Sequence, residues 1–247
     1  MKDILALIDE KKYIYSQLPF FEFLQDNSIH PLKRLAFAPC AASFIMSFAD
    51  LNKYVLRQEP TKDKIQAILN QHTYEDDFHW QWFLEDMQNL GFNCSLELNT
   101  SLKFLWSQET KNSRLLTYEL YKYIAQSEPL EKLVILKAIE ATANVCLSLT
   151  KCLVDVLQLV NCNEYKYFGG HHLSLETSHN SHSQELEKFF EEIYISDKSR
   201  QNSINLVNSV FELFTKWTYE LLNYAQSYQQ SQPLPLQLPE AQLIELA

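Results

Sequence analysis

Residues 129–160 read PLEKLVILKAIEATANVCLSLTKCLVDVLQLV, and this stretch decides the fold class. Pro129 suits the first turn of a helix, because the N–H that it lacks would have no partner there. Apolar side chains then recur at helical spacing, with no glycine or further proline to interrupt them. We predict one long apolar helix from Pro129 to about Val160.

The rest of the chain also has helical patterning, and it contains only 3 glycines in 247 residues. A β-sheet protein of this size would need many more tight turns, most of which require glycine. Further helices are expected at about Asp3–Leu24 with a break at Pro19, Pro31–Leu56, from an N-cap at Thr61 to Leu90, Leu102–Ala125, His171–Ile195 and Lys198–Tyr228. We therefore predict an all-α bundle of about seven helices over residues 1–230, followed by an extended C-terminal tail at residues 231–247.

Composition limits the classes of partner. The formal net charge is −10, and the sequence has no basic stripe that could follow a phosphate backbone. The apolar run at residues 35–48 is too short to span a bilayer, and the N-terminus does not resemble a signal peptide. Five scattered cysteines without a CxxC spacing predict free, buried thiols in a reducing compartment. We expect a cytoplasmic protein that neither spans a membrane nor binds nucleic acid.

Six of the seven histidines fall into two short clusters. In the later cluster, His172, Glu176 and His179 are spaced four and three residues apart, so they share one face of a helix. Two imidazoles and a carboxylate on adjacent turns can converge on a metal ion. The alternative is an exposed polar patch, because serine, threonine and asparagine surround these three residues.

The earlier cluster contains His72 and His79, seven residues apart on a predicted helix. They share a face, but about 10 Å separates them along the helix axis, which suits two ions better than one. Glu75, four residues before His79, is an additional candidate ligand. The alternative is that these are surface residues, since Asp76 and Asp77 lie beside them.

Glu140 interrupts an otherwise apolar face of the helix at residues 129–160. An unpaired buried carboxylate costs several kcal/mol, so Glu140 must be paired, protonated or bound to a metal. Pairing with a Lys or Arg of another helix is the alternative to metal binding. An inward-facing acid on one helix and His/Glu sets on two others are together typical of carboxylate-bridged metal sites in bundles. Such ligands favour iron or manganese, and the cysteines do not fit a zinc pattern.

This set of residues resembles the ligand pattern of the heme-oxygenase-like di-metal oxidases and oxygenases. It looks most like the CADD-like group, which is related to the TENA and PqqC proteins. Members carry a Glu-x6-His pair on one helix, a lone Glu on a later helix, and His-x3-Asp/Glu-x2-His on a third. Glu140 matches the lone Glu, and His172, Glu176 and His179 match the third element.

In the first pair His79 matches the family's His, whereas His72 stands where the family has Glu. The resemblance covers roughly residues 15–225 and implies a seven-helix heme-oxygenase-like bundle with dioxygen chemistry at a non-heme di-iron or iron–manganese centre. Its implied metal ligands are His72, His79, Glu140, His172, Glu176 and His179, with Glu75 as a substitute for His72. Relatives oxidise amino-acid, amine or fatty-acid substrates, and one branch makes p-aminobenzoate by consuming its own tyrosine.

We expect an O₂-activating oxidoreductase with two iron ions, or iron and manganese, and a small-molecule substrate that has an apolar part. Relatives are often dimers, so a homodimer is compatible with this expectation. The second interpretation is a metal-free or degenerate site on the same fold that binds a small hydrophobic ligand or a protein partner, which His72 favours. The least favoured interpretation is a heme protein with His79 or His172 as the axial ligand.

Overall fold

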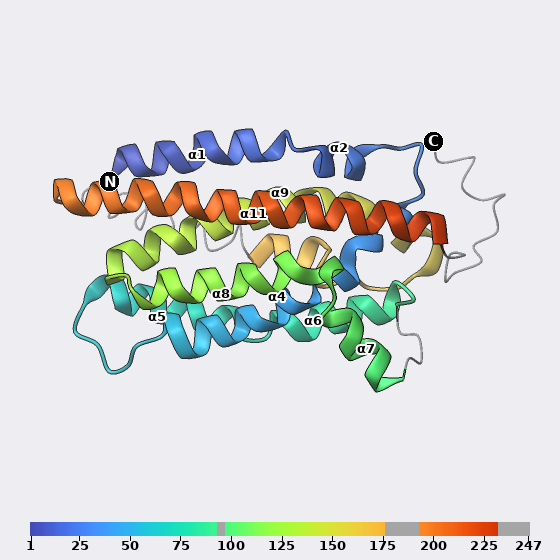
Figure 1. Cartoon of the computed structure of the whole chain (residues 1–247), viewed down its shortest axis with the longest axis horizontal. Coiled ribbons are helices and arrows are strands. Elements are labelled where there is room, and N and C mark those ends of the chain that lie inside the picture. The colour runs from blue at the N-terminus through green and yellow to red at the C-terminus, as the bar shows by residue number, and fades with distance from the viewer. Residues whose placement is uncertain (93–96, 176–192, 232–247) are drawn as a thin grey trace.

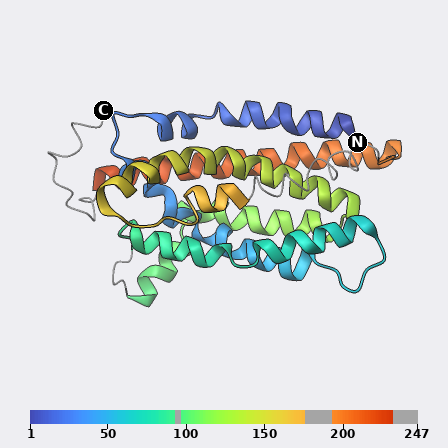
Figure 2. The ribbon, with the colours of Figure 1, turned by 180° about the vertical axis from the view of Figure 1, so that it is seen from behind.

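The computed structural model describes residues 1–92, 97–175 and 193–231, and over these ranges the chain forms helices and no β-strand. The predicted all-α fold is confirmed. Helices α9 (Pro129–Asn161) and α11 (Asp197–Ser231) run side by side along the bundle, and α1 (Lys2–Ser16) packs against both (Figures 1 and 2). The bundle is therefore elongated along its two longest helices.

Helix α9 begins and ends almost where the sequence predicts. Glu128 and Glu131 form a capping box at its start, each carboxylate accepting a hydrogen bond from the backbone N–H of the other residue. The helix stops at Cys162, which has a left-handed φ of 56°. Between these ends, residues such as Leu136 and Val154 are buried in the core of the bundle.

A second layer of helices covers the long pair. Helices α4 (Ala38–Leu51) and α8 (Lys111–Ala125) contact α11, α5 (Lys64–Asp76) contacts α9, and α6 (His79–Asn89) contacts α4. The remaining elements are α2 (Pro19–Gln25), α3 (Pro31–Arg34), η1 (Leu35–Phe37), η2 (Asn52–Leu56), α7 (Leu98–Leu105), η3 (Gln108–Thr110) and a helical stretch at residues 170–175. This arrangement places α5 against the central helix α9, and the candidate site lies where α5, α6 and α9 come together.

The expected helix from Thr61 to Leu90 is interrupted in the structure. Asp77 and Phe78 separate α5 from α6, and the stretch before this break, residues 70–77, is almost entirely polar. The N-cap of α5 is Asp63, whose side chain accepts from the backbone N–H of Gln66 at 2.9 Å. Thr61 is therefore not the cap, and the two predicted histidine ligands of this region lie on different helices.

Two other expected helices are also divided. Residues 31–56 form α3, η1, α4 and η2 in succession, and residues 102–125 are shared between α7 and α8. Most of the expected helix at His171–Ile195 lies outside the described residues. The expected tail at residues 231–247 also lies outside them, except for its first residue. The expected helix at Lys198–Tyr228 corresponds to α11.

Two helical stretches within the described residues, Pro31–Leu56 and Pro129–Asn161, are long and apolar enough to cross a membrane by length and composition alone. In each, 56% of the most apolar segment is buried inside the bundle, and the core helix of a soluble protein meets the same criterion. The absence of a membrane span stays a prediction.

The four cysteines that the structure describes, Cys40, Cys146, Cys152 and Cys162, are free thiols, but they are not uniformly buried. Cys40 is buried as expected, whereas Cys152 and Cys162 are exposed. The expectation of buried thiols is therefore wrong for these two residues.

Candidate metal centre

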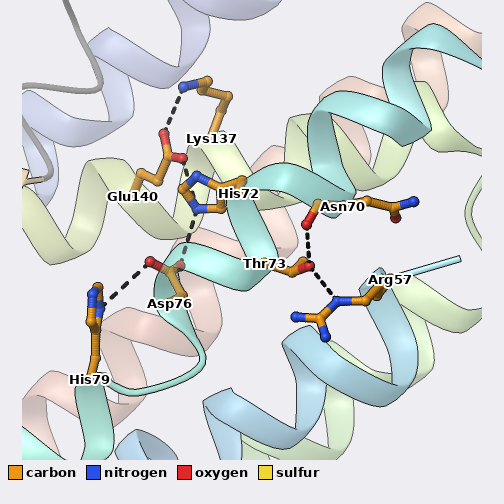
Figure 3. Close-up of polar contacts among 8 residues, drawn as sticks. All are labelled: Arg57, Asn70, His72, Thr73, Asp76, His79, Lys137 and Glu140. Carbon is orange, nitrogen blue, oxygen red and sulfur yellow. Dashed lines mark hydrogen bonds and ion pairs between the residues drawn. The ribbon is translucent and has the colours of Figure 1, made fainter. Parts of the chain in front are cut away.

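Asp76 lies between two histidines at the junction of α5 and α6 (Figure 3). Its Oδ2 is 3.1 Å from His72 Nε2, one turn earlier on α5, and its Oδ1 is 3.5 Å from His79 Nδ1. His79 is the first residue of α6, so the break after α5 turns its imidazole toward this carboxylate. On one straight helix the two histidines would be about 10 Å apart along the axis. The structure therefore brings His72 and His79 to a single carboxylate.

Glu140 of α9 faces the same cluster from the neighbouring helix (Figure 3). Its Oε1 is 3.4 Å from His72 Nε2, and its Oε2 accepts a hydrogen bond from Lys137 Nζ at 2.8 Å. Lys137 is one turn away on α9 itself, so a Lys partner is present but comes from the same helix. Both carboxylate oxygens of Glu140 therefore face a basic group.

The third predicted element contributes His172, which is buried with 5% exposure. Its ring centroid is 4.4 Å from that of His79, and the indole of Trp82 stacks on His79 with centroids 4.6 Å apart. His172 Nδ1 lies 3.0 Å from the carbonyl oxygen of Tyr167. Imidazoles from three segments of the chain therefore gather beside Asp76.

Asp76, which the alternative interpretation of the sequence places at the surface, is buried with 6% exposure. Burial alone would raise the pKa of its carboxyl, but the imidazoles of His72, His79 and His172 outweigh that effect and hold the pKa below its ordinary value. The spacing, four residues after His72 and three before His79, is the signal in the sequence that could have found it. Glu75, the additional candidate ligand, is exposed.

The donor set fits iron or manganese chemically, because these metals accept imidazole nitrogen and carboxylate oxygen. The N···O separations of 3.1 and 3.5 Å around Asp76 are close to those of donors that share one ion, roughly 3 Å for bonds of about 2.1 Å. Within residues 1–92, 97–175 and 193–231, however, no three His, Cys, Asp or Glu side chains form a group that could hold a metal ion by themselves. Glu176 and His179, the other two predicted ligands, lie outside these ranges.

An apolar cavity of about 100 Å³ adjoins the cluster, and Asp76, His79 and His172 are among the residues that line it. The rest of its lining is mostly aromatic and aliphatic and includes Phe37, Ala41, Phe44, Phe168, Phe214, Trp217 and Leu221. Trp80 and Ala49 line both this cavity and an open groove beside α4 and α6, so they form part of the wall between the cavity and the surface. A small apolar ligand in the cavity would contact the His/Asp cluster directly.

Tyr15 and Tyr167 also line this cavity. Thr218 Oγ1 donates to Phe214 O, so the hydroxyl of Tyr15, 2.7 Å from Thr218 Oγ1, donates to it. Burial raises the pKa of the Tyr15 phenol well above its ordinary value and that of the Cys146 thiol to about 12. Both groups are therefore neutral at physiological pH, and they add polar atoms to the cavity without adding charge.

Comparison with protein-family models finds no match, and comparison with curated protein sequences finds none either. Among solved structures, the chain is similar to a domain of unknown function with a heme oxygenase-like fold from Shewanella denitrificans. The TM-score is 0.62 over 96% of both chains, at 12% sequence identity. At this identity the likeness concerns the fold and not the chemistry, so the CADD-like subgroup stays a prediction. This chain has the heme oxygenase-like fold.

Proposed function

We propose that this protein is a non-heme, metal-dependent oxidoreductase that activates O₂ to oxidise a small substrate with an apolar part. The observation that carries the proposal is the meeting of imidazole and carboxylate side chains from α5, α6, α9 and residues 170–175 beside an apolar cavity. Such chemistry requires ligands held on rigid helices and a pocket that keeps water away from the reacting atoms.

The proposed metal ligands are His72, Asp76, His79, Glu140 and His172, together with Glu176 and His179 from the sequence pattern. We propose Asp76 instead of Glu75 as the carboxylate ligand of this region, since Asp76 is buried and contacts both His72 and His79. Bound iron, or iron with manganese, would supply the redox chemistry and the open coordination positions that O₂ requires.

The protein's own side chains hold these donors in place. Lys137 binds Oε2 of Glu140, which leaves Oε1 directed at His72. The two oxygens of Asp76 face one imidazole each, so the carboxylate fixes the separation of those rings. The aromatic lining of the cavity excludes water from the face where a substrate would lie.

The second candidate function is a metal-free site of the same fold that binds a small hydrophobic ligand or a protein partner. The observation that favours it is that the charges of the cluster already compensate one another. His72 lies between two carboxylates, and Lys137 pairs with Glu140. A protein without its metal would keep these pairs and the apolar cavity.

Metal content separates the two candidates. The protein is loaded with Fe(II) or Mn(II) under anaerobic conditions, desalted and measured by ICP mass spectrometry, together with Asp76→Ala, Glu140→Ala and the matched control Glu75→Ala. We expect about two ions per chain in the wild type and in the control, whose altered side chain is exposed, and about one or fewer in the other two variants.

Each other outcome has a definite meaning. About one ion per wild-type chain would indicate that His72 has disabled one metal position. No ion in any of the four proteins would overturn the oxygenase proposal and favour the metal-free binder. Equal metal content in all four would place the ion outside this cluster.

A further inference from the structure

A buried carboxylate holds the loop that leads from α9 to His172. Asp86 of α6 has no exposed surface, and its Oδ1 and Oδ2 accept hydrogen bonds from the backbone N–H groups of Lys166 and Phe168, each at 2.8 Å. Asp86 follows His79 by seven residues on α6. Helix α6 therefore carries the proposed ligand His79 and also Asp86, which anchors the loop before the proposed ligand His172.

The loop is also fixed from α9. Thr150 Oγ1 donates to the carbonyl oxygen of Phe168 at 3.2 Å. The backbone N–H of His172 donates to the carbonyl oxygen of Lys166, also at 3.2 Å. Backbone groups at both ends of residues 166–172 are therefore paired, and the backbone of the loop has little freedom to rotate.

Two contacts of this loop involve the same peptide unit, namely the bond from the Phe168 N–H to Asp86 and the contact of the Tyr167 carbonyl with His172. The Tyr167 carbonyl and the Phe168 N–H belong to the same trans peptide, so they point in opposite directions. The N–H points at Asp86, and the carbonyl oxygen lies 3.0 Å from His172 Nδ1. Rotation of this peptide plane would break both contacts together. Asp86 therefore fixes the direction of the carbonyl that His172 meets.

This carbonyl determines which ring nitrogen of His172 carries the proton. A carbonyl oxygen can only accept, so Nδ1 of the neutral imidazole is the protonated nitrogen and Nε2 has the lone pair. Nε2 is then the atom able to bind a metal ion. The other tautomer would lose the bond to Tyr167 and would place a proton on Nε2.

We propose that Asp86 is a positioning residue that sets the tautomer and ring orientation of His172 through the Tyr167–Phe168 peptide. The ionised carboxylate also polarises that peptide, which strengthens the hydrogen bond from His172 Nδ1 to the carbonyl. The consequence for metal affinity rests on the proposed function. The effect on the tautomer belongs to the metal-free protein and does not depend on it.

The tautomer is measured from the ring ¹⁵N resonances of His172 in metal-free protein, at a pH where the imidazole is neutral. We expect the Nδ1–H form in the wild type. Asp86→Asn, which turns an amide N–H₂ toward a backbone N–H, should move a measurable fraction to the Nε2–H form. The matched control is Glu85→Gln, which removes the surface ion pair of Glu85 with Lys166 Nζ at 2.8 Å but leaves the backbone contacts of the loop. It should keep the wild-type tautomer.

Affinity for Co(II), used as a probe metal, gives a second readout. Asp86→Asn should weaken it by about 10–100-fold, and Glu85→Gln should leave it unchanged. Should Asp86→Asn not fold, Asp86→Ser, which leaves room for a water at the two amides, carries the same expectations.

The proposal fails if wild-type His172 is protonated on Nε2, if the Asp86 variants keep the pure Nδ1–H form, or if Glu85→Gln shifts the tautomer equally. A wild-type protein that binds no metal but shows the expected tautomer shift would overturn the proposed function and support the role of Asp86.

Discussion

Gly169 lies where no side chain fits, whereas a side chain at its neighbour Gly170 would make one tight contact that can yield. A Cβ at Gly169 would be 2.0 Å from the carbonyl oxygen of Tyr165, while a Cβ at Gly170 would be 3.3 Å from Cε of Lys151, the movable end of a side chain. In urea denaturation, Gly169→Ala should lower the free energy of unfolding by about 1–3 kcal/mol, and Gly170→Ala should change it by less than about 0.5 kcal/mol. Equal losses in the two variants would contradict this packing.

Asp86 should give the protein a distinctive pH dependence. Burial raises the pKa of its carboxyl to about 6, against the lowering effect of the N–H groups of Phe168, Lys166 and Tyr167. Between its unfolded pKa of 3.8 and about 6, the folded protein therefore binds a proton that the unfolded chain has released. The stability contributed by this group falls as pH rises through that window, by up to about 3 kcal/mol.

Comparison with Asp86→Asn isolates this contribution, because every other titrating group is common to both proteins. As the pH rises from 4 to 7, the free energy of unfolding of the wild type should fall relative to that of the variant. Urea denaturation at several pH values measures it. Two parallel pH profiles would show that Asp86 titrates normally.

At the candidate centre, His72, His79, Glu140 and His172 could be named from the sequence, whereas the buried carboxylate of Asp76 was not among the candidates. His72 and His79 can be recognised by residue type and spacing alone. The inward position of Asp76 depends on the break after α5, beside which Asp77 pairs with Arg57 at 2.8 Å. That contact joins residues 20 positions apart, so local periodicity contains no trace of it.

At the scale of helices, a carboxylate of α11 holds the start of α8. Glu220 is 8% exposed, and its Oε2 and Oε1 accept from the backbone N–H groups of Asn112 and Ser113 at 2.6 and 2.9 Å. These N–H groups have no partner within their own helix, and the negative charge also suits the helix dipole. Glu220 therefore joins two helices that are far apart in sequence.

Removing this carboxylate should be costly. Glu220→Ala should lower the free energy of unfolding by about 2–3 kcal/mol, since one buried and one half-buried N–H group would lose their acceptor, and Glu220→Gln should cost less. Chemical denaturation measures both. The control is Glu212→Ala on the same helix, which removes a surface pair with Lys216 and should barely change stability. A similar loss in the control would mean that the cap contributes little.

Helix boundaries could be predicted where their causes are local. Pro129 and the uninterrupted apolar pattern that follows it are enough to define α9. The boundary between α7 and α8 has a different cause, because the guanidinium of Arg114 donates to the carbonyl oxygens of Trp106 and Ser107. An arginine that binds the end of the preceding helix looks, in sequence, like any surface arginine.

The scarcity of glycine and the long apolar helices were sufficient to predict an all-α bundle, and the likeness to a solved heme oxygenase-like fold agrees with it. The cavity could not be predicted in this way. Its volume of about 100 Å³ is the space left between side chains of several helices. Such a space depends on how those side chains pack in three dimensions and not on their order in the chain.

The cavity should bind a small apolar probe, and filling it should be tolerated. Ala41 lines it and is 1% exposed, so Ala41→Leu places methyl groups in space that is open. Xenon binding, followed by ¹²⁹Xe NMR, should be present in the wild type and lost in this variant, because dry apolar cavities take up such probes.

The matched control for this change is Ala36→Leu. Ala36 is fully buried but does not line the cavity, so the larger side chain should cost about 1–3 kcal/mol through overpacking. Ala41→Leu should cost less than the control in the same denaturation experiment. A greater loss for Ala41→Leu, or xenon binding that survives it, would show that the space is not available.

Trp82 stacks on His79, and it also lies edge-on to His171 with ring centroids 4.8 Å apart. An excited indole transfers an electron readily to a protonated imidazole in van der Waals contact, and far less readily to a neutral one. We therefore expect the fluorescence of Trp82 to depend on whether His79 or His171 carries a charge. The chain contains its own optical reporter of protonation at the place where we propose that its chemistry occurs.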